Sequence, residues 1–128
     1  MKKLFLICMA AIVLFAADFD WYKYEDGLKK AKELNRPIFI MISQKGCVTC
    51  EYMDDVAFEN EELVEFVEHN YIPIKLDIKE AKRLGYKAYG TPTFYFLRSD
   101  GTKIGRPIAG GATAKVFLEK LKEIKRDL

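Results

Sequence analysis

The sequence predicts an α/β domain in which a mixed β-sheet carries helices on both faces. Residues 38–43 form a continuous apolar, β-rich run, which suits a strand buried on both sides of a sheet. Helical and strand patterns alternate around this run, as they do in βαβ units with right-handed crossovers. Farther on, Asp100-Gly101 separates two strand-like runs and predicts a hairpin, which would add antiparallel strands to the sheet.

The first part of the domain follows from the spacing of apolar residues. This spacing predicts a strand at residues 71–78 and helices over residues 25–34, 47–56, 60–70 and 79–84. Asn60 is a good N-cap residue, and Gly85 suits the end of a short helix. Pro73 favours an edge position for its strand, because proline cannot donate a ladder hydrogen bond.

The last part of the domain is predicted to be a hairpin followed by a helix. Strands are expected over residues 93–97 and 102–108, on either side of the Asp-Gly turn. Residues 112–125 then form an amphipathic helical pattern. We expect its buried face to consist of Val116, Phe117, Leu121 and Ile124.

The N-terminus has the layout of a secretory signal peptide. Met1-Lys2-Lys3 is a basic start, and an uncharged apolar segment follows up to Ala17. We expect a signal peptide at residues 1–17, cleaved near Ala16 or Ala17, and a single domain at residues 18–128. Retention as a membrane anchor and a buried N-terminal helix are the alternatives. A cleaved signal predicts a periplasmic or otherwise secreted protein.

The charge balance argues against a nucleic-acid partner. Lys2 and Lys3 account for the whole net charge of +2, so the expected mature domain is formally neutral. No stripe of lysine and arginine is visible in the sequence. The short chain also leaves no room for a dimerisation domain, and we expect a monomer.

Cys47 and Cys50 form the Cys-x-x-Cys motif of Gly46-Cys47-Val48-Thr49-Cys50, between a strand and a helix. This placement is typical of a redox pair, because the helix N-terminus favours the thiolate. Cys47 should be the more exposed cysteine and the nucleophile, and Cys50 the resolving cysteine. A zinc site needs four ligands, and His69 is the only histidine, so we expect no metal.

A second motif, Gly90-Thr91-Pro92-Thr93-Phe94, opens a strand about forty residues downstream. Together with the cysteine motif, the hairpin and the last helix, it makes residues 20–128 resemble the thioredoxin-fold superfamily. The nearest resemblance is to secreted thioredoxin-like reductases. These include the C-terminal domain of the transmembrane thiol-disulfide interchange protein and the thioredoxins of sulfur-oxidation clusters.

The resemblance implies the parts of a substrate-binding site. It implies a cis peptide bond between Thr91 and Pro92, packed against the cysteine pair, which presents the Thr91 backbone to an extended substrate. The expected substrate-binding residues are Gly90, Thr91, Pro92, Val48 and Thr49. No cofactor is implied beyond the redox-active disulfide itself.

Two positions depart from ordinary thioredoxin. Gly46 stands where thioredoxin has a tryptophan, and Met41 stands where it has a buried aspartate that assists proton transfer. Another group or water must therefore handle the proton of Cys50. Lys45 and Glu51 are both candidates, and the sequence does not rank them.

We therefore expect an extracytoplasmic thiol-disulfide oxidoreductase that mainly reduces disulfides of exported proteins. Val48-Thr49 has no cation to stabilise the thiolate further, which favours a reductant over a strong oxidant. A membrane electron donor of the thiol-disulfide interchange type is implied, since no NADPH site is visible. The alternatives are a disulfide oxidase or isomerase, a non-enzymatic thioredoxin-like binding module and a small metal chaperone.

Overall fold

The computed structural model describes residues 19–128, so the expected signal peptide at residues 1–17 lies outside the described residues. Its central sheet has the strand order β2-β1-β3-β4. The strands are β1 (Ile38–Ser43), β2 (Ile72–Asp77), β3 (Thr93–Leu97) and β4 (Ile108–Ala109). The helices are α1 (Tyr24–Leu34), α2 (Val48–Asp55), the 3₁₀ turn η1 (Ala57–Glu59), α3 (Glu61–Asn70), α4 (Ile78–Arg83) and α5 (Ala114–Arg126).

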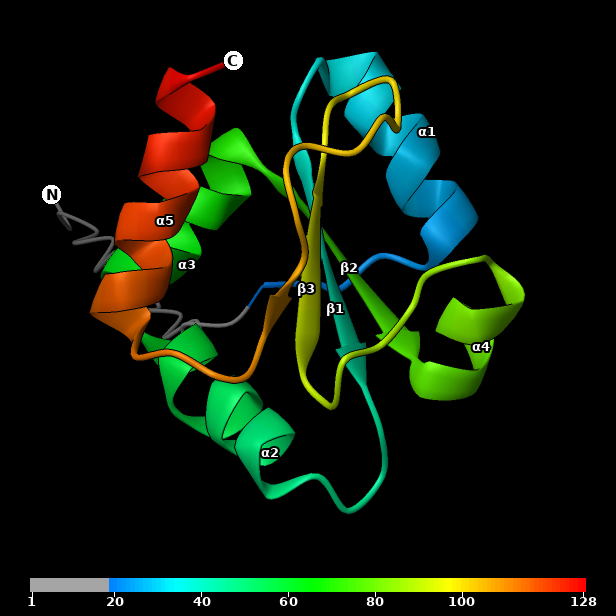
Figure 1. The fold of residues 1–128 in the computed structure, drawn as a ribbon. Helices are drawn as coiled ribbons and strands as arrows, with labels where there is room; N and C mark the ends of the chain where they lie inside the picture. Colours follow the sequence, from blue (N-terminus) through cyan, green and yellow to red (C-terminus); the bar gives the residue numbers. More distant parts are fainter. Residues whose placement is uncertain (1–18) are drawn as a thin grey trace, which may run out of the picture.

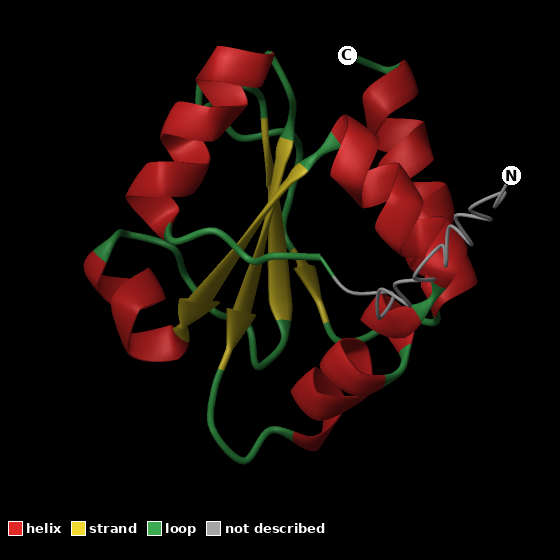
Figure 2. Ribbon diagram, turned by 180° about the vertical axis from the view of Figure 1, so that it is seen from behind, coloured by secondary structure: helices red, strands yellow, loops and turns green. Residues whose placement is uncertain are grey.

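The predicted α/β class with a mixed sheet is confirmed. β1 pairs in parallel with β2 and antiparallel with β3, and β3 pairs antiparallel with β4. In Figure 1, α1 and α4 lie on one side of the sheet, whereas α2, α3 and α5 lie on the other. Figure 2 shows the same two layers of helices from behind. No helix within residues 19–128 is long and apolar enough to cross a bilayer.

Pro73 lies in an edge strand, as predicted, because β2 is the outermost of the four strands. The backbone N–H of Tyr22 donates to the carbonyl of Pro73 at 2.9 Å, so the outer side of this residue faces the N-terminal segment. A proline here costs no hydrogen bond to β1, since its ring nitrogen points away from that strand.

The predicted strand over residues 102–108 is wrong. Only Ile108–Ala109 pairs with β3, and Lys103 adds one isolated bridge to Leu97. Between them, Gly105 has a φ of +62°, a left-handed conformation that breaks the extended path, and Pro107 has no N–H for a ladder. The Asp-Gly turn is present, but the chain after it leaves the sheet.

Alternation along β1 divides the core into two clusters. Phe39 and Met41 face α2, α3 and α5, whereas Ile38, Ile40 and Ile42 face α1 and α4. Successive side chains of a strand point to opposite faces of the sheet, and here both faces are apolar because helices cover both. The cluster on the Phe39 side also contains Cys50, so this part of the core supports the cysteine motif.

The predicted buried face of the last helix needs one correction. Phe117, Leu121 and Ile124 are buried, but Val116 is 56 % exposed and Leu118 takes the fourth buried position. Residues 117, 118, 121 and 124 follow the i, i+1, i+4, i+7 pattern of a single helix face. Val116 lies outside that face, and its apolar character in the sequence does not show this.

Candidate active site

The cysteine motif lies at the start of α2, immediately after the loop that leaves β1. Cys47 is the N-cap residue of α2, and the Cys50 backbone N–H lies 3.1 Å from the Cys47 Sγ. The two cysteines form a disulfide with a Cα–Cα distance of 5.2 Å. The sulfur of Cys47 therefore occupies the place where a side-chain oxygen caps other helices, at the positive end of the helix dipole.

The two cysteines differ in accessibility. The side chain of Cys50 is 2 % exposed and belongs to the core beneath α2, whereas Cys47 is half-buried. Val48 and Thr49 between them are exposed. Only the first cysteine of the pair can therefore meet another protein, which is the asymmetry expected from the sequence.

The segment around Pro92 lies next to the cysteine pair, although it is distant from the pair in the sequence. The Thr91–Pro92 peptide bond is cis. The carbonyl oxygen of Thr91 lies 3.4 Å from the Cys47 Sγ, although the two residues are 44 positions apart. Gln44 Nε2 also donates to Thr91 Oγ1 at 2.9 Å, so the loop before Cys47 is tied to the same residue.

Hydrogen bonds around Thr93 fix the chain on both sides of the proline. Thr93 Oγ1 donates to the Gly90 carbonyl at 2.7 Å and accepts from the Tyr89 N–H at 3.0 Å. Pro92 and Thr93 are buried, Thr91 is half-buried and Gly90 is exposed. The structure thus brings the expected substrate residues Thr91 and Pro92 to the cysteines and leaves the Thr91 backbone near the surface.

A third segment at this site was not recognised in the sequence. The Gly110 N–H donates to the Pro92 carbonyl at 2.8 Å, and the Ala112 N–H lies 3.4 Å from the Met53 sulfur. A Cβ at Gly111 would lie only 2.7 Å from Thr49 Cγ2, so this backbone can approach α2 only without a side chain. The glycine pair was the available signal, but the sequence analysis did not connect it with the cysteine motif.

Of the two positions that depart from thioredoxin, one is buried and one is exposed. Met41 is fully buried and lies in the same core cluster as Cys50, while Gly46 lies on the surface with a φ of +81°. Lys45 and Glu51, the two candidates for handling the Cys50 proton, are both exposed. Neither forms an ion pair within residues 19–128.

A partly exposed ion pair lies near the site, and the sequence did not indicate it. Lys75 Nζ lies 2.6 Å from Asp54 Oδ2, and each side chain is about one third exposed. Asp54 follows Cys50 by one helical turn, and Lys75 lies opposite Met41 in the pairing of β1 with β2. The i, i+4 spacing between Cys50 and Asp54 was the feature of the sequence that could have placed Asp54 near the cysteines.

The remaining candidate ligands do not gather near the cysteines. His69 is exposed near the end of α3, where its Nδ1 lies 2.8 Å from the carbonyl oxygen of Glu65. Within the described part of the chain, no three His, Cys, Asp or Glu side chains are grouped so that they could hold a metal ion.

The fold and the site together define a protein of the thioredoxin-fold superfamily with a Cys-x-x-Cys disulfide at a helix N-terminus. A family model for the thioredoxin-like domain matches residues 24–125, and the chain belongs to this family. The resemblance found in the sequence is thereby confirmed. The family and the Cys47–Cys50 pair are consistent with a thiol-disulfide oxidoreductase.

Solved structures with the same fold include a thioredoxin, an oxidoreductase and a domain of DsbD. A thioredoxin from Thermus thermophilus has a TM-score of 0.70 at 20 % identity, and the match covers 84 % of this chain and 88 % of that one. The DsbH oxidoreductase has a TM-score of 0.68 at 17 % identity and 87 % coverage of both chains. The reduced C-terminal domain of DsbD from Neisseria meningitidis has 0.60 at 20 % identity, with 77 % and 91 % covered.

Several curated relatives with similar sequences are much longer proteins. An uncharacterized protein of Caenorhabditis elegans is 32 % identical over 103 residues, which is 72 % of this chain but 14 % of the worm protein. The chain therefore spans only a small part of the length of this relative.

Proposed function

We propose that this protein is an extracytoplasmic thiol-disulfide oxidoreductase that works mainly as a protein-disulfide reductase. The observation that carries the proposal is the unequal exposure of two bonded cysteines at the start of α2. Cys47 is half-buried beside Thr91 and can be reached, whereas Cys50 is 2 % exposed. One sulfur can attack a foreign disulfide, and the other can act only within the protein.

In the proposed reaction, the Cys47 thiolate attacks one sulfur of a substrate disulfide. A mixed disulfide forms, and the other substrate sulfur leaves as a thiolate that takes up a proton. Cys50 then loses its proton and attacks the Cys47 sulfur, which forms the intramolecular disulfide and releases the first substrate sulfur as a thiol. The substrate gains two electrons and two protons, and the protein loses them.

The site supports this sequence through groups that favour the thiolate of Cys47. The Cys50 N–H is aimed at the Cys47 Sγ at 3.1 Å, and the free amides of the first turn of α2 point the same way. The Thr91 backbone lies beside this sulfur, where it could pair with an extended substrate segment that includes Gly90 or Pro92. Exposed Val48 and Thr49 would line the approach.

The reductive direction rests on the short sequence between the cysteines. Val48 and Thr49 carry no charge, so the residues between the cysteines add no stabilisation of the thiolate to that of the helix and backbone. Strong oxidants, at about −120 mV, owe their potential to extra stabilisation of the reduced form, whereas reductants lie at about −270 mV. We therefore place this protein toward the reducing end of the scale.

We further propose that the protein acts outside the cytoplasm and receives electrons from a membrane donor of the thiol-disulfide interchange type. The support is the signal-like sequence of residues 1–17 and the likeness in fold to the C-terminal domain of DsbD. N-terminal sequencing of the exported protein tests the first part, with a start near residue 17 or 18 as the expected result.

Reduction of insulin disulfides by the dithiol form, together with the reduction potential, tests the catalytic proposal. Cys47→Ser should lower the rate to the background, and Cys50→Ser should accumulate a mixed disulfide because nothing resolves it. Unchanged insulin reduction in Cys47→Ser would overturn the catalytic role. A measured potential near −120 mV, on the scale above, would overturn the reductive direction and favour an oxidase.

A further inference from the structure

The outer side of α2 carries large apolar side chains that no other part of the described chain covers. Val48 is 78 % exposed, Tyr52 38 % and Val56 55 %. They follow one another at intervals of four residues, and the Val56 N–H still donates to the Tyr52 carbonyl at 2.9 Å, so the helical path reaches Val56. We call these three residues the α2 ridge.

The ridge is not the buried face of an amphipathic helix. Cys50 and Met53 take that role, and both are buried under α2. A surface helix of a globular domain ordinarily turns polar residues outward, and a contiguous apolar strip on its outer side marks an interaction surface. Here one strip of the outer side, from Val48 through Tyr52 to Val56, is apolar.

A row of acidic residues flanks the ridge. Glu51 and Asp55 are exposed, lie one helical turn apart and form no ion pair within residues 19–128. The surrounding sequence reinforces their charge, because residues 46–74 contain eight Asp and Glu and no Lys or Arg. Residues 75–128, in contrast, contain thirteen Lys and Arg and six Asp and Glu.

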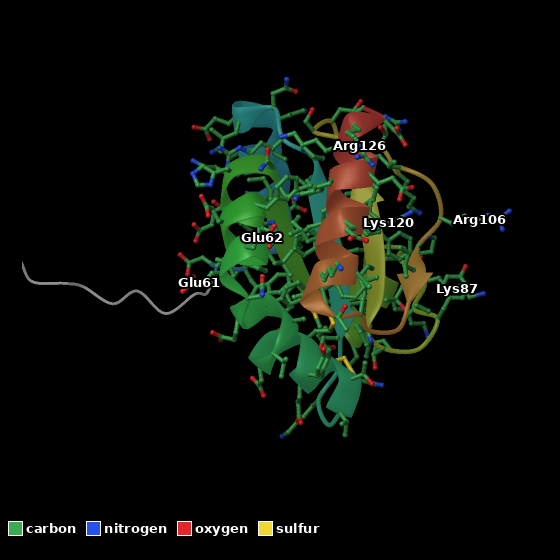
Figure 3. All side chains as sticks on the ribbon, turned by 90° about the vertical axis from the view of Figure 1, so that its left-hand side faces the viewer. Glu61, Glu62, Lys87, Arg106, Lys120 and Arg126 are labelled. Atoms are coloured by element: carbon green, nitrogen blue, oxygen red, sulfur yellow. A yellow bond between two sulfur atoms is a disulfide. The ribbon has the colours of Figure 1, made fainter. Side chains whose placement is uncertain are left out.

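Some of the acidic and basic residues lie on different sides of the molecule, whereas Lys122 lies 3.9 Å from Glu62 and Lys75 lies 2.6 Å from Asp54. In Figure 3, Glu61 and Glu62 on α3 lie on one side, and Lys87 and Arg106 lie on the opposite side. The ridge belongs to the acidic segment, and it starts at the residue next to Cys47. At 1.5 Å per residue it runs about 12 Å from Val48 to Val56, away from the disulfide.

We propose that the α2 ridge is a docking surface for the protein that exchanges disulfides with Cys47. This inference rests on the proposed function. The partner would present an apolar strip flanked by lysine and arginine, next to its own reactive cysteine. Apolar contact would hold it along α2, and the acidic row would speed its encounter and reject acidic proteins. The site at Cys47 would then select partners by a surface beyond the residues that touch the disulfide.

Synthetic peptides that mimic such a partner test the proposal. Each peptide is an amphipathic helix with one cysteine at its end, held as a disulfide with thionitrobenzoate. The first peptide has a leucine strip flanked by lysine, and the second has the same strip flanked by glutamate. Reduced protein donates two electrons to this disulfide and releases one peptide thiol and one coloured thionitrobenzoate thiolate, which gives the rate.

The lysine peptide should react about tenfold faster than the glutamate peptide at low salt, and the difference should shrink as salt is added. Asp55→Lys should bring the two rates close together. Val56→Ser should slow both peptides several-fold. Equal rates for the two peptides with the unmodified protein would overturn the proposal.

Two exposed residues away from the ridge provide matched controls. Val116 on α5 is 56 % exposed, almost the same as Val56, and Glu65 on α3 is exposed and acidic like Asp55. Val116→Ser should leave both peptide rates within about twofold of the parent rates, and Glu65→Lys should leave the ratio of the two rates within about twofold of the parent ratio. If Val116→Ser slows the peptides as much as Val56→Ser does, or Glu65→Lys changes the ratio as much as Asp55→Lys does, the docking surface is refuted.

Reduction of glutathione disulfide separates this inference from the proposed function, since so small a substrate cannot cover the ridge. In high salt, which screens the net negative charge of glutathione disulfide, Asp55→Lys, Val56→Ser and both control variants should reduce it at the parent rate. A parent protein that reduces neither insulin nor glutathione disulfide would refute the proposed function, whereas normal reduction of both without peptide selectivity would refute only the docking surface. Sedimentation of the parent protein should show a monomer. A dimer that Val56→Ser dissociates would mean that a second copy occupies the ridge, and would overturn the proposal.

Discussion

The two faces of the sheet are built from different kinds of side chain, although both are buried. The face toward α2, α3 and α5 is rich in aromatic rings, and Phe39 alone has five ring neighbours within 6.2 Å. The face toward α1 and α4 consists mainly of isoleucine and leucine, and its only buried aromatic residues within residues 19–128 are Tyr86 and Tyr95. Only the aromatic face includes a cysteine of the motif, Cys50.

This difference shows that a single layer of the protein supports the site. Rings are large, and a single ring can touch several helices at once, so the aromatic face joins α2, α3 and α5 into one block beneath the disulfide. The aliphatic face attaches α1 and α4 to the sheet without contacting α2. We therefore expect damage to the aromatic face to reach the cysteines, and damage to the aliphatic face to reduce stability alone.

The largest expected effect comes from removing one side chain on each face. Phe39→Ala should lower the free energy of unfolding by about 3–5 kcal/mol, and Ile40→Ala by about 2–5 kcal/mol, because both leave cavities in a fully buried core. Denaturant unfolding measures both values. In the reduced proteins, alkylation of Cys50 should accelerate in Phe39→Ala and stay near the parent rate in Ile40→Ala. Equal acceleration in the two variants would contradict the expected difference between the two faces.

Alkaline pH should weaken both faces through their buried tyrosines. Burial raises the pKa of Tyr71 on the aromatic face, and burial followed by the hydrogen bond to Tyr24 raises the pKa of Tyr86 on the aliphatic face. In the unfolded chain a tyrosine ionises near pH 10, so above that pH the folded protein keeps protons that the unfolded chain has lost. Stability is therefore complete below about pH 10 and falls as the pH rises further.

Variants with phenylalanine in place of tyrosine measure how much each face contributes to the loss of stability at alkaline pH. Tyr71→Phe and Tyr86→Phe should each make the fall of unfolding free energy shallower, by at most about 1.4 kcal/mol per pH unit. Tyr71 also donates to the Leu121 carbonyl at 2.6 Å, so its variant should lose some stability at neutral pH as well. An alkaline slope that neither variant changes would contradict the assignment to these two phenols.

The smallest expected effects concern one helix cap on each face. Asn60 Oδ1 accepts from the Leu63 N–H at 3.0 Å at the start of α3, and Asp77 Oδ1 accepts from the Lys79 N–H at 2.9 Å at the start of α4. Asn60→Ala should cost about 1 kcal/mol, and Asp77→Ala about 0.5 kcal/mol, since α4 has only six residues and buries only Ala81.

Thermal or denaturant unfolding of these variants gives the two costs. Asn60→Ser retains a side-chain acceptor and serves as the control, with a loss well below that of Asn60→Ala. A larger cost for Asp77→Ala than for Asn60→Ala would show that α4 contributes more to the aliphatic face than its length indicates.

Local patterns in the sequence determined most of the secondary structure. The buried strands at 38–43 and 93–97 have the predicted bounds, because a run of β-branched and aromatic residues between loop signals leaves little choice of conformation. The N-cap at Asn60 and the start of α2 at Cys47 were equally local features. The redox chemistry was visible for the same reason, since both cysteines lie within one turn of a helix N-terminus.

The tertiary structure decided which other distant segments meet at the site. The position of Thr91 beside Cys47 was already implied by the family resemblance, but only the structure placed Gly111 against Thr49 and Asp54 against Lys75. It also exposed Val116 and ended the second hairpin strand early. These outcomes depend on how elements far apart in the chain pack together, and packing is set by shape and burial summed over many residues rather than by any short pattern. The sequence alone therefore determined the motif and its helix, whereas packing decided what surrounds Cys47 and which side of α2 remains open.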